Sequence, residues 1–155
     1  MSQDSFMNSR SRLHRSEQRP ARNEYNPEPL MVNIPQAAWQ NQNFRAVLWT
    51  GNRLQMVLMS IPVHEDIGTE VHTSVDQMIR VEEGQAAVQV GSDKDHLSAP
   101  KRLNRGDAVF VPAGTWHNII NLGSRPLKLS TIYAPPNHPV GTVQHTKADA
   151  EAAGY

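Results

Sequence analysis

Residues 106–121 constrain the fold of this chain more than any other segment. They read GDAVFVPAGTWHNIIN, so a short apolar run is followed by a Pro-x-Gly turn and then by a second apolar run. Pro112 cannot donate to a sheet ladder, and Gly114 accepts backbone angles that other residues resist. The pattern predicts two strands joined by this turn, with His117 near the start of the second. Taken alone, a histidine beside apolar residues is more often a hydrogen-bonded structural residue than a metal ligand.

A second segment, residues 68–84, supplies partners for His117. It reads GTEVHTSVDQMIRVEEG. Side chains two apart on a strand share a face, so Glu70 and His72 are expected to point together, and Gln77 is expected to face them from the next strand. Imidazole and carboxylate groups are common ligands for iron, manganese, nickel or zinc, and the Gln77 amide adds a neutral fourth donor. These four side chains form the predicted metal site.

The two segments resemble the paired motifs of the cupin superfamily. The second motif of that family is glycine, five residues, Pro-x-Gly, two residues, His, three residues and Asn. This chain matches it at every position, namely Gly106, Pro112, Gly114, His117 and Asn121. The first motif is glycine, five residues, His-x-His, three or four residues, Glu, six residues and glycine. Here His72 and Gly84 fit it, whereas Glu70 replaces the first histidine, Gln77 the glutamate, and His64 the leading glycine.

This resemblance extends over residues 44–136 and implies an all-β fold, the cupin double-stranded β-helix, a jelly-roll-like small barrel. Small single-domain cupins of this kind include proteins called mannose-6-phosphate isomerase-like. Full-length phosphomannose isomerases hold zinc with Gln, His, Glu and His in chain order. In this chain the same set would be Glu70, His72, Gln77 and His117, with two members exchanged. The resemblance thus implies a divalent metal (Zn, Fe, Mn or Ni) and a homodimer in which the N-terminal lead-in is a candidate strand for exchange.

Composition narrows the class further. A chain of 155 residues suits one domain, and the absence of cysteine excludes disulfides and thiolate metal sites. We expect a tail at residues 1–25, a cupin barrel at 26–137 and a C-terminal extension at 138–155. No apolar run approaches the roughly 20 residues that span a bilayer, and the first residues lack a hydrophobic signal stretch, so a cytoplasmic location is expected.

The first 25 residues are polar and mildly basic. They hold five arginines against Asp4, Glu17 and Glu24, and few apolar side chains. Such a segment buries too little surface to order itself, so we interpret it as a mobile tail. It lacks the interleaved aromatics of a nucleic-acid arm, which makes a nucleic-acid partner an unfavoured reading.

The remaining pattern indicates short strands. Prolines at 27, 29 and 35 argue against a helix and predict an extended lead-in that pairs along a sheet edge, followed by one helical turn at residues 36–43. Residues 91–105 are polar and are expected to form a loop, and the sheet is expected to end after Pro136. A short helix is expected at 147–153. The expected strands are residues 44–50, 54–61, 68–72, 77–82, 86–90, 108–111, 116–121 and 127–133.

Period-two alternation predicts which side chains face the interior. Gln77 should point inward with Ile79 and Val81, and His117 with Ile119 and Asn121. No lysine or arginine falls clearly on that face. His64 is a spare ligand candidate, and Asp76 replaces Gln77 only if the register slips by one. The histidines in polar stretches, expected to be exposed, are His14, His96, His138 and His145.

Two function classes follow from this site. In the first, the metal polarises a substrate oxygen or activates dioxygen, and Glu70 is a ligand or a proton acceptor in an isomerase or dioxygenase cycle. In the second, the barrel binds a sugar or a similar small molecule and catalyses nothing, because fold does not fix function. The chain lacks the Gly-x-Ser-x-Gly turn of a hydrolase and a Gly-rich phosphate loop.

Overall fold

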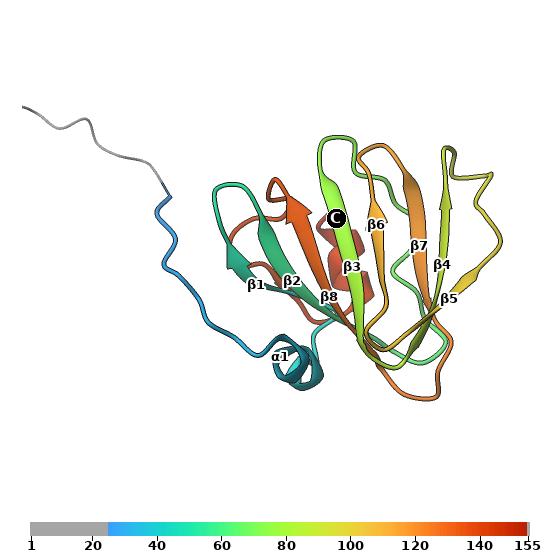
Figure 1. Cartoon of the computed structure of the whole chain (residues 1–155), viewed down its shortest axis with the longest axis horizontal. Coiled ribbons are helices and arrows are strands. Elements are labelled where there is room, and N and C mark those ends of the chain that lie inside the picture. Colours follow the sequence, from blue (N-terminus) through green and yellow to red (C-terminus); the bar gives the residue numbers. More distant parts are fainter. Residues whose placement is uncertain (1–24, 155) are drawn as a thin grey trace, which may run out of the picture.

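The structure, a computed structural model, describes residues 25–154. Within that range two antiparallel sheets share one core, with strand orders β6-β3-β8-β2-β1-β9 and β5-β4-β7 (Figure 1). This is the all-β double-stranded β-helix that the sequence predicts. The elements are α1 (Ile34–Gln40), β1 (Arg45–Thr50), β2 (Gln55–Ile61), β3 (Asp76–Glu83), β4 (Gln85–Gly91), β5 (Lys101–Asn104), β6 (Ala108–Val111), β7 (Trp116–Asn121), β8 (Leu127–Ala134), β9 (Val143–Gln144) and α2 (Lys147–Ala152).

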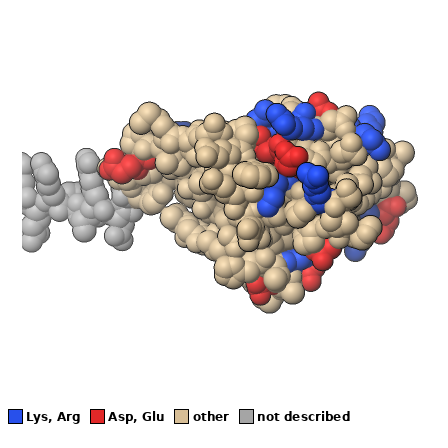
Figure 2. Space-filling view, turned by 90° about the horizontal axis from the view of Figure 1, so that it is seen from below, with Lys and Arg blue, Asp and Glu red and all other residues tan. Residues whose placement is uncertain are grey.

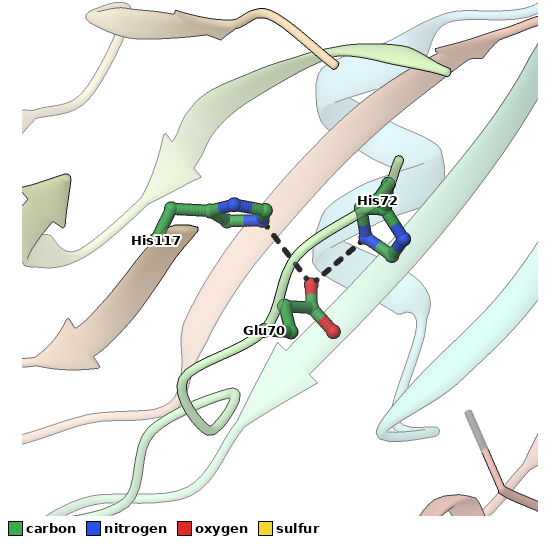
Figure 3. A group of neighbouring side chains, drawn as sticks. All are labelled: Glu70, His72 and His117. Atoms are coloured by element: carbon green, nitrogen blue, oxygen red, sulfur yellow. Dashed lines mark hydrogen bonds and ion pairs between the residues drawn. The ribbon is translucent and has the colours of Figure 1, made fainter. Parts of the chain in front are cut away.

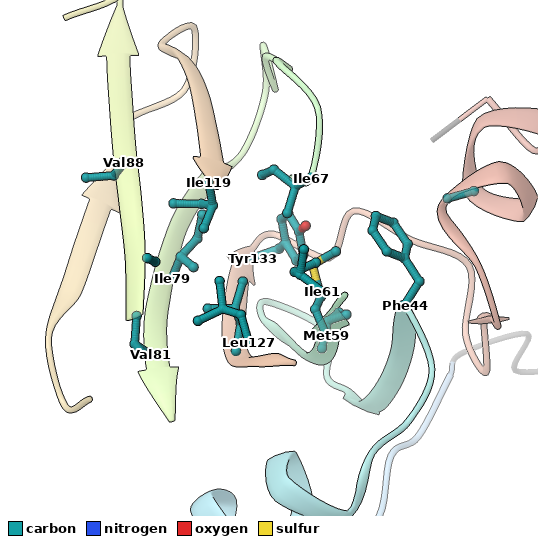
Figure 4. Close-up of a cluster of buried hydrophobic side chains, with 14 of the residues drawn as sticks. Phe44, Met59, Ile61, Ile67, Ile79, Val81, Val88, Ile119, Leu127 and Tyr133 are labelled. Carbon is teal, nitrogen blue, oxygen red and sulfur yellow. The ribbon is translucent and has the colours of Figure 1, made fainter. Parts of the chain in front are cut away.

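The core lies between the inner faces of the two sheets. The predicted alternation is confirmed, because Gln77, Ile79 and Val81 of β3 are buried. In β7, His117 and Ile119 are both fully buried, at 0% exposure. Figure 4 shows how β3, β7 and β8 bring aliphatic side chains together around Tyr133. The inner wall is therefore apolar, with a few polar side chains set into it.

The helix α1 covers part of the outer face of the larger sheet, where it packs against β2, β3 and β8. Its N-cap is Asn33, whose side chain accepts a 3.0 Å hydrogen bond from the Gln36 backbone N–H. The prediction that Pro35 excludes a helix was wrong, because proline at the first helical turn loses no hydrogen bond. The helix accordingly begins two residues earlier than the turn expected at residues 36–43. Residues 25–33 are extended but join no sheet, contrary to the expected edge pairing.

Two strands form where none was expected. The predicted loop at 91–105 contains β5, which pairs with β4 although Leu103 is its one apolar residue. The sheet also continues past Pro136, since β9 pairs with β1. Both strands follow from contacts with distant segments, because their local sequence carries no alternation.

The C-terminal helix agrees with its prediction at residues 147–153. A capping box between Thr146 and Asp149 fixes the start of α2, and Ala150 packs into the core. Lys147 pairs with Asp66 at 2.5 Å and so ties α2 to the loop after β2. Within residues 25–154, no helix is long and apolar enough to cross a membrane. The predicted tail, residues 1–25, lies outside the described residues except for Tyr25.

Candidate metal centre

Three of the four predicted ligands meet inside the barrel. Potential ligand atoms of Glu70, His72 and His117 all lie within 4.8 Å of one another. Figure 3 shows the Glu70 carboxylate between the two imidazole rings, with Oε1 3.3 Å from Nε2 of His72 and 3.3 Å from Nε2 of His117. The two rings are 5.6 Å apart, centre to centre. One carboxylate and two imidazoles thus converge on one point.

Backbone pairing produces this convergence. Glu70 and His117 form an isolated antiparallel bridge, in which each backbone N–H donates to the other residue's carbonyl at 2.9 Å. The Gly114 N–H donates to the His72 carbonyl at 2.8 Å, which joins the Pro-x-Gly turn to the other half of the site. The full strand expected at residues 68–72 does not form, because this bridge is its pairing to β7. The predicted convergence nevertheless occurs.

The orientation of His117 leaves Nε2 available to a ligand. Nδ1 lies 3.0 Å from the Thr115 carbonyl, an interaction that favours a proton on Nδ1 and a lone pair on Nε2. Nε2 is buried, and its contact with Glu70 lacks hydrogen-bond geometry. A buried imidazole nitrogen without a proper hydrogen-bond partner is the state expected of a metal ligand before it binds.

The Glu70 carboxyl is ionised in this site. Burial raises its pKa, but contacts with His117 and His72 outweigh burial and hold the pKa at about 2. The carboxylate is therefore charged at neutral pH, as a ligand of a divalent cation must be.

The fourth predicted ligand, Gln77, lies on the adjacent inner wall. Its amide Nε2 donates to Thr131 Oγ1 at 3.0 Å, and its buried Oε1 has no hydrogen-bond partner. In the ladder, Gln77 pairs with Tyr133, and the Tyr133 ring meets His72 edge-on at 5.4 Å. The amide oxygen of Gln77 is thus a buried acceptor close to the three converging residues.

Three buried residues near the site were missed by sequence reasoning. His138, expected to be exposed, is 6% exposed, and its ring meets Tyr133 edge-on at 5.1 Å. Burial and then the Arg45 charge lower the pKa of His138 to about 4. Arg45 is itself 2% exposed and donates to Gln144 at 2.8 Å, so one arginine does lie in the interior. Alternation with Val47 in β1 was the only sequence signal for it.

Burial also explains the state of Tyr133. Desolvation, and then the Glu70 charge, raise the pKa of its hydroxyl well above the usual range. The side chain therefore stays neutral beside the ion pair.

The alternative ligand candidates lie elsewhere. His64 is a loop residue with a φ of 67° and is outside the group of converging side chains. Asp76 is exposed and accepts a 2.9 Å hydrogen bond from the Ala113 N–H, so the register has not slipped. His96 and His145 are exposed, as predicted, whereas His14 lies outside the described residues.

Comparison with known proteins agrees with this geometry. The Cupin domain family matches residues 57–133, a range that contains all four predicted ligands. The uncharacterized protein YrkC of Bacillus subtilis is 55% identical over 130 residues, which are 84% of this chain and 70% of that protein. The uncharacterized protein L612 of Acanthamoeba polyphaga mimivirus is 38% identical over 125 residues, 80% of this chain and 76% of that protein.

Solved structures show the same fold. BH2720 from Bacillus halodurans has a TM-score of 0.80 and 52% identity, and the match covers 83% of this chain and 98% of that one. A Klebsiella pneumoniae protein with a double-stranded β-helix domain has a TM-score of 0.58 at 19% identity over 77% of this chain and 100% of that one, a likeness of fold alone. With its fold, its paired motifs and these relatives, the chain belongs to the cupin superfamily.

Proposed function

We propose that this protein binds a divalent metal ion through Glu70, His72 and His117, with the Gln77 amide oxygen as a neutral fourth donor. The observation that carries the proposal is the position of the Glu70 carboxylate, 3.3 Å from an imidazole nitrogen on either side. Metal–ligand bonds of about 2.1 Å place neighbouring donors roughly 3.0–3.4 Å apart, for octahedral and tetrahedral angles respectively. The spacing therefore suits donors that share one ion.

The donor set also limits the kind of ion. Nitrogen and oxygen ligands suit zinc, iron, manganese and nickel, and the chain has no thiolate to select a softer metal. Two imidazoles, one carboxylate and one amide carry a single negative charge, so the site leaves a divalent ion with net positive charge. An ion in that state attracts a polar oxygen of a substrate.

The reaction classes that fit are those of a mannose-6-phosphate isomerase-like or a dioxygenase-like cupin. A bound metal would supply Lewis acidity toward a substrate oxygen. Glu70 is ionised at neutral pH and is 20% exposed at its side chain, so a substrate that displaced it from the ion would meet a proton acceptor. His117 is fully buried and keeps a positioning contact to Thr115.

A second candidate function is a binding module that holds a small polar molecule without turnover. The narrow opening of the site favours it: the side chains of Glu70 and His72 are only 20% and 16% exposed, and His117 is not exposed at all. An enclosed ion with no exchangeable water would serve structure or recognition. The two candidates share the metal site and differ in whether solvent reaches the ion.

Elemental analysis of protein purified without chelator tests the metal site. We expect one equivalent of a divalent metal in the parent protein and in His96→Ala, whose side chain is 80% exposed, and loss of that metal in His117→Ala. Full occupancy in His117→Ala would reject the site. Relaxation of solvent protons by the manganese-loaded protein then separates the two functions, because only an ion open to substrate exchanges its water.

A substitution at Gln77 tests the amide donor. Gln77→Glu adds a carboxylate to the site, so the dissociation constant for a divalent metal should fall. If Gln77→Glu weakens binding, the amide oxygen does not contact the ion, and the other three residues form the site without it.

A further inference from the structure

An uncovered apolar row crosses the outer face of the larger sheet. Cross-strand partners on five consecutive strands align side by side, and all five are apolar: Phe110, Met78, Ile132, Met56 and Trp49, in the order β6, β3, β8, β2, β1. Phe110 is 75% exposed and the other four are partly exposed. Phe110, Met78 and Ile132 line a cavity of about 430 Å³. A row of this length on a protein surface marks an interaction site.

The polar part of the same face is already covered. Along β8, Lys128 and Ser130 alternate with inward residues and are buried, where Lys128 donates to the Asn41 carbonyl beside α1 and Ser130 donates to Glu82. The helix thus covers the polar half of the face and leaves the apolar row open, the reverse of what a monomer requires.

The N-terminal arm, residues 25–33, has the complementary property. It extends away from the body in Figure 1 and exposes apolar side chains, with Leu30 48%, Met31 94% and Val32 42% exposed. Pro27 and Pro29 hold the arm extended and remove backbone donors from it, so it docks through side chains instead of adding a strand. Seen from below, the arm and the adjoining surface are mostly uncharged, whereas Lys and Arg gather at the other end of the molecule (Figure 2).

The arm cannot fill the cavity of its own chain. The Trp49 indole donates to the Glu28 carbonyl at 2.8 Å, so the arm is held at β1, and α1 holds its other end at Ile34. Met31 is three residues from Glu28, a reach of about 10 Å. The cavity lies over β3 and β6, three and four strands from β1, or roughly 14–19 Å across the sheet.

We propose that the arm of a second copy of this chain docks on the apolar row, with Met31 in the cavity beside Phe110. A two-fold axis makes the exchange reciprocal, so each protomer covers the other's row. The thioether of Met31 adapts to an irregular apolar cavity and packs well against an aromatic edge. The only charged residue of the arm is Glu28, and the row has none, so no charge is buried. This interface does not depend on the metal site.

Sedimentation of the full chain over a range of concentrations tests the interface. We expect a dimer for the parent, a dimer dissociation constant about 10-fold or more weaker for Phe110→Lys and for Met31→Asp, and no change for Leu122→Lys, a control at an exposed leucine outside the row. Phe110 and Met31 are largely exposed, so neither substitution should unfold the protomer.

A mixing experiment separates arm exchange from other dimers. In a heterodimer of Phe110→Lys and Met31→Asp protomers, one of the two contacts keeps both native residues. The other contact brings the introduced lysine and the introduced aspartate together as an ion pair. We therefore expect the mixture to dimerise more tightly than either variant alone. A monomeric parent, a dimer that survives Met31→Asp, or a mixture no tighter than its components would overturn the proposal.

Discussion

Replacement of His138 should flatten the loss of stability in mild acid. Its pKa falls from 6.5 in the unfolded chain to about 4 in the folded protein, chiefly because burial disfavours the charged ring. Between those two values the unfolded chain binds a proton that the folded protein does not, so stability is lost as the pH falls from 6.5 toward 4. The difference of about 2.5 pH units corresponds to about 3 kcal/mol at most, or roughly 1.4 kcal/mol for each pH unit inside the window.

Urea unfolding of metal-free protein at several pH values between 7.5 and 4.5 measures this loss. His138→Gln removes the titrating ring while the main-chain hydrogen bonds of residue 138 to Gln55, at 2.9 and 2.8 Å, stay in place. We expect the parent and His96→Gln to lose stability steeply below pH 6.5, and His138→Gln to lose much less. Glu70 enters only below pH 4.5, because its folded pKa is about 2. An equal slope in parent and His138→Gln would refute the assignment of the window to His138.

Two further substitutions test the backbone and the core. Gly114→Ala places a side chain at a φ of 82° with no atom within 4 Å of the new Cβ, so backbone strain alone should cost about 1–2 kcal/mol, measured by urea unfolding. Ile119→Ala removes a fully buried side chain beside the metal site and should cost about 2–5 kcal/mol, whereas Leu122→Ala, at 47% exposure, should stay within about 0.5 kcal/mol.

The sequence carries the site because the site is built by short-range rules. His117 follows a turn that Pro112 and Gly114 impose, and strand alternation places Gln77, Ile79 and Val81 on one inner face. The meeting of Glu70 with His117 needed the resemblance to cupins as well, since the bridge joins residues far apart in the chain. Motif spacing therefore predicted a contact that local pattern alone does not contain.

The features that sequence reasoning missed all depend on distant partners. His138 sits in a polar stretch, yet it is buried because Gln55 accepts hydrogen bonds from the Asn137 and His138 N–H groups and donates to the His138 carbonyl. Arg45 is buried because Gln144 of β9 meets it across a strand pair. Neither partner can be identified from residues nearby in sequence, so polarity suggested exposure where the fold provides a hydrogen-bonded interior.

His64 shows why a departure from the motif leaves the fold intact. It occupies the place of the leading glycine and keeps the backbone that glycine favours, with a φ of 67°. Strain in this conformation costs about 1–2 kcal/mol, but glycine would return about 0.5–1 kcal/mol through the greater freedom of the unfolded chain. His64→Gly should therefore stabilise the protein by no more than about 1 kcal/mol, whereas the β-branched His64→Val should destabilise it measurably in urea unfolding. A neutral His64→Val would mean that the loop relaxes out of this conformation, and that the turn, unlike the one at Gly114, does not help to position Glu70.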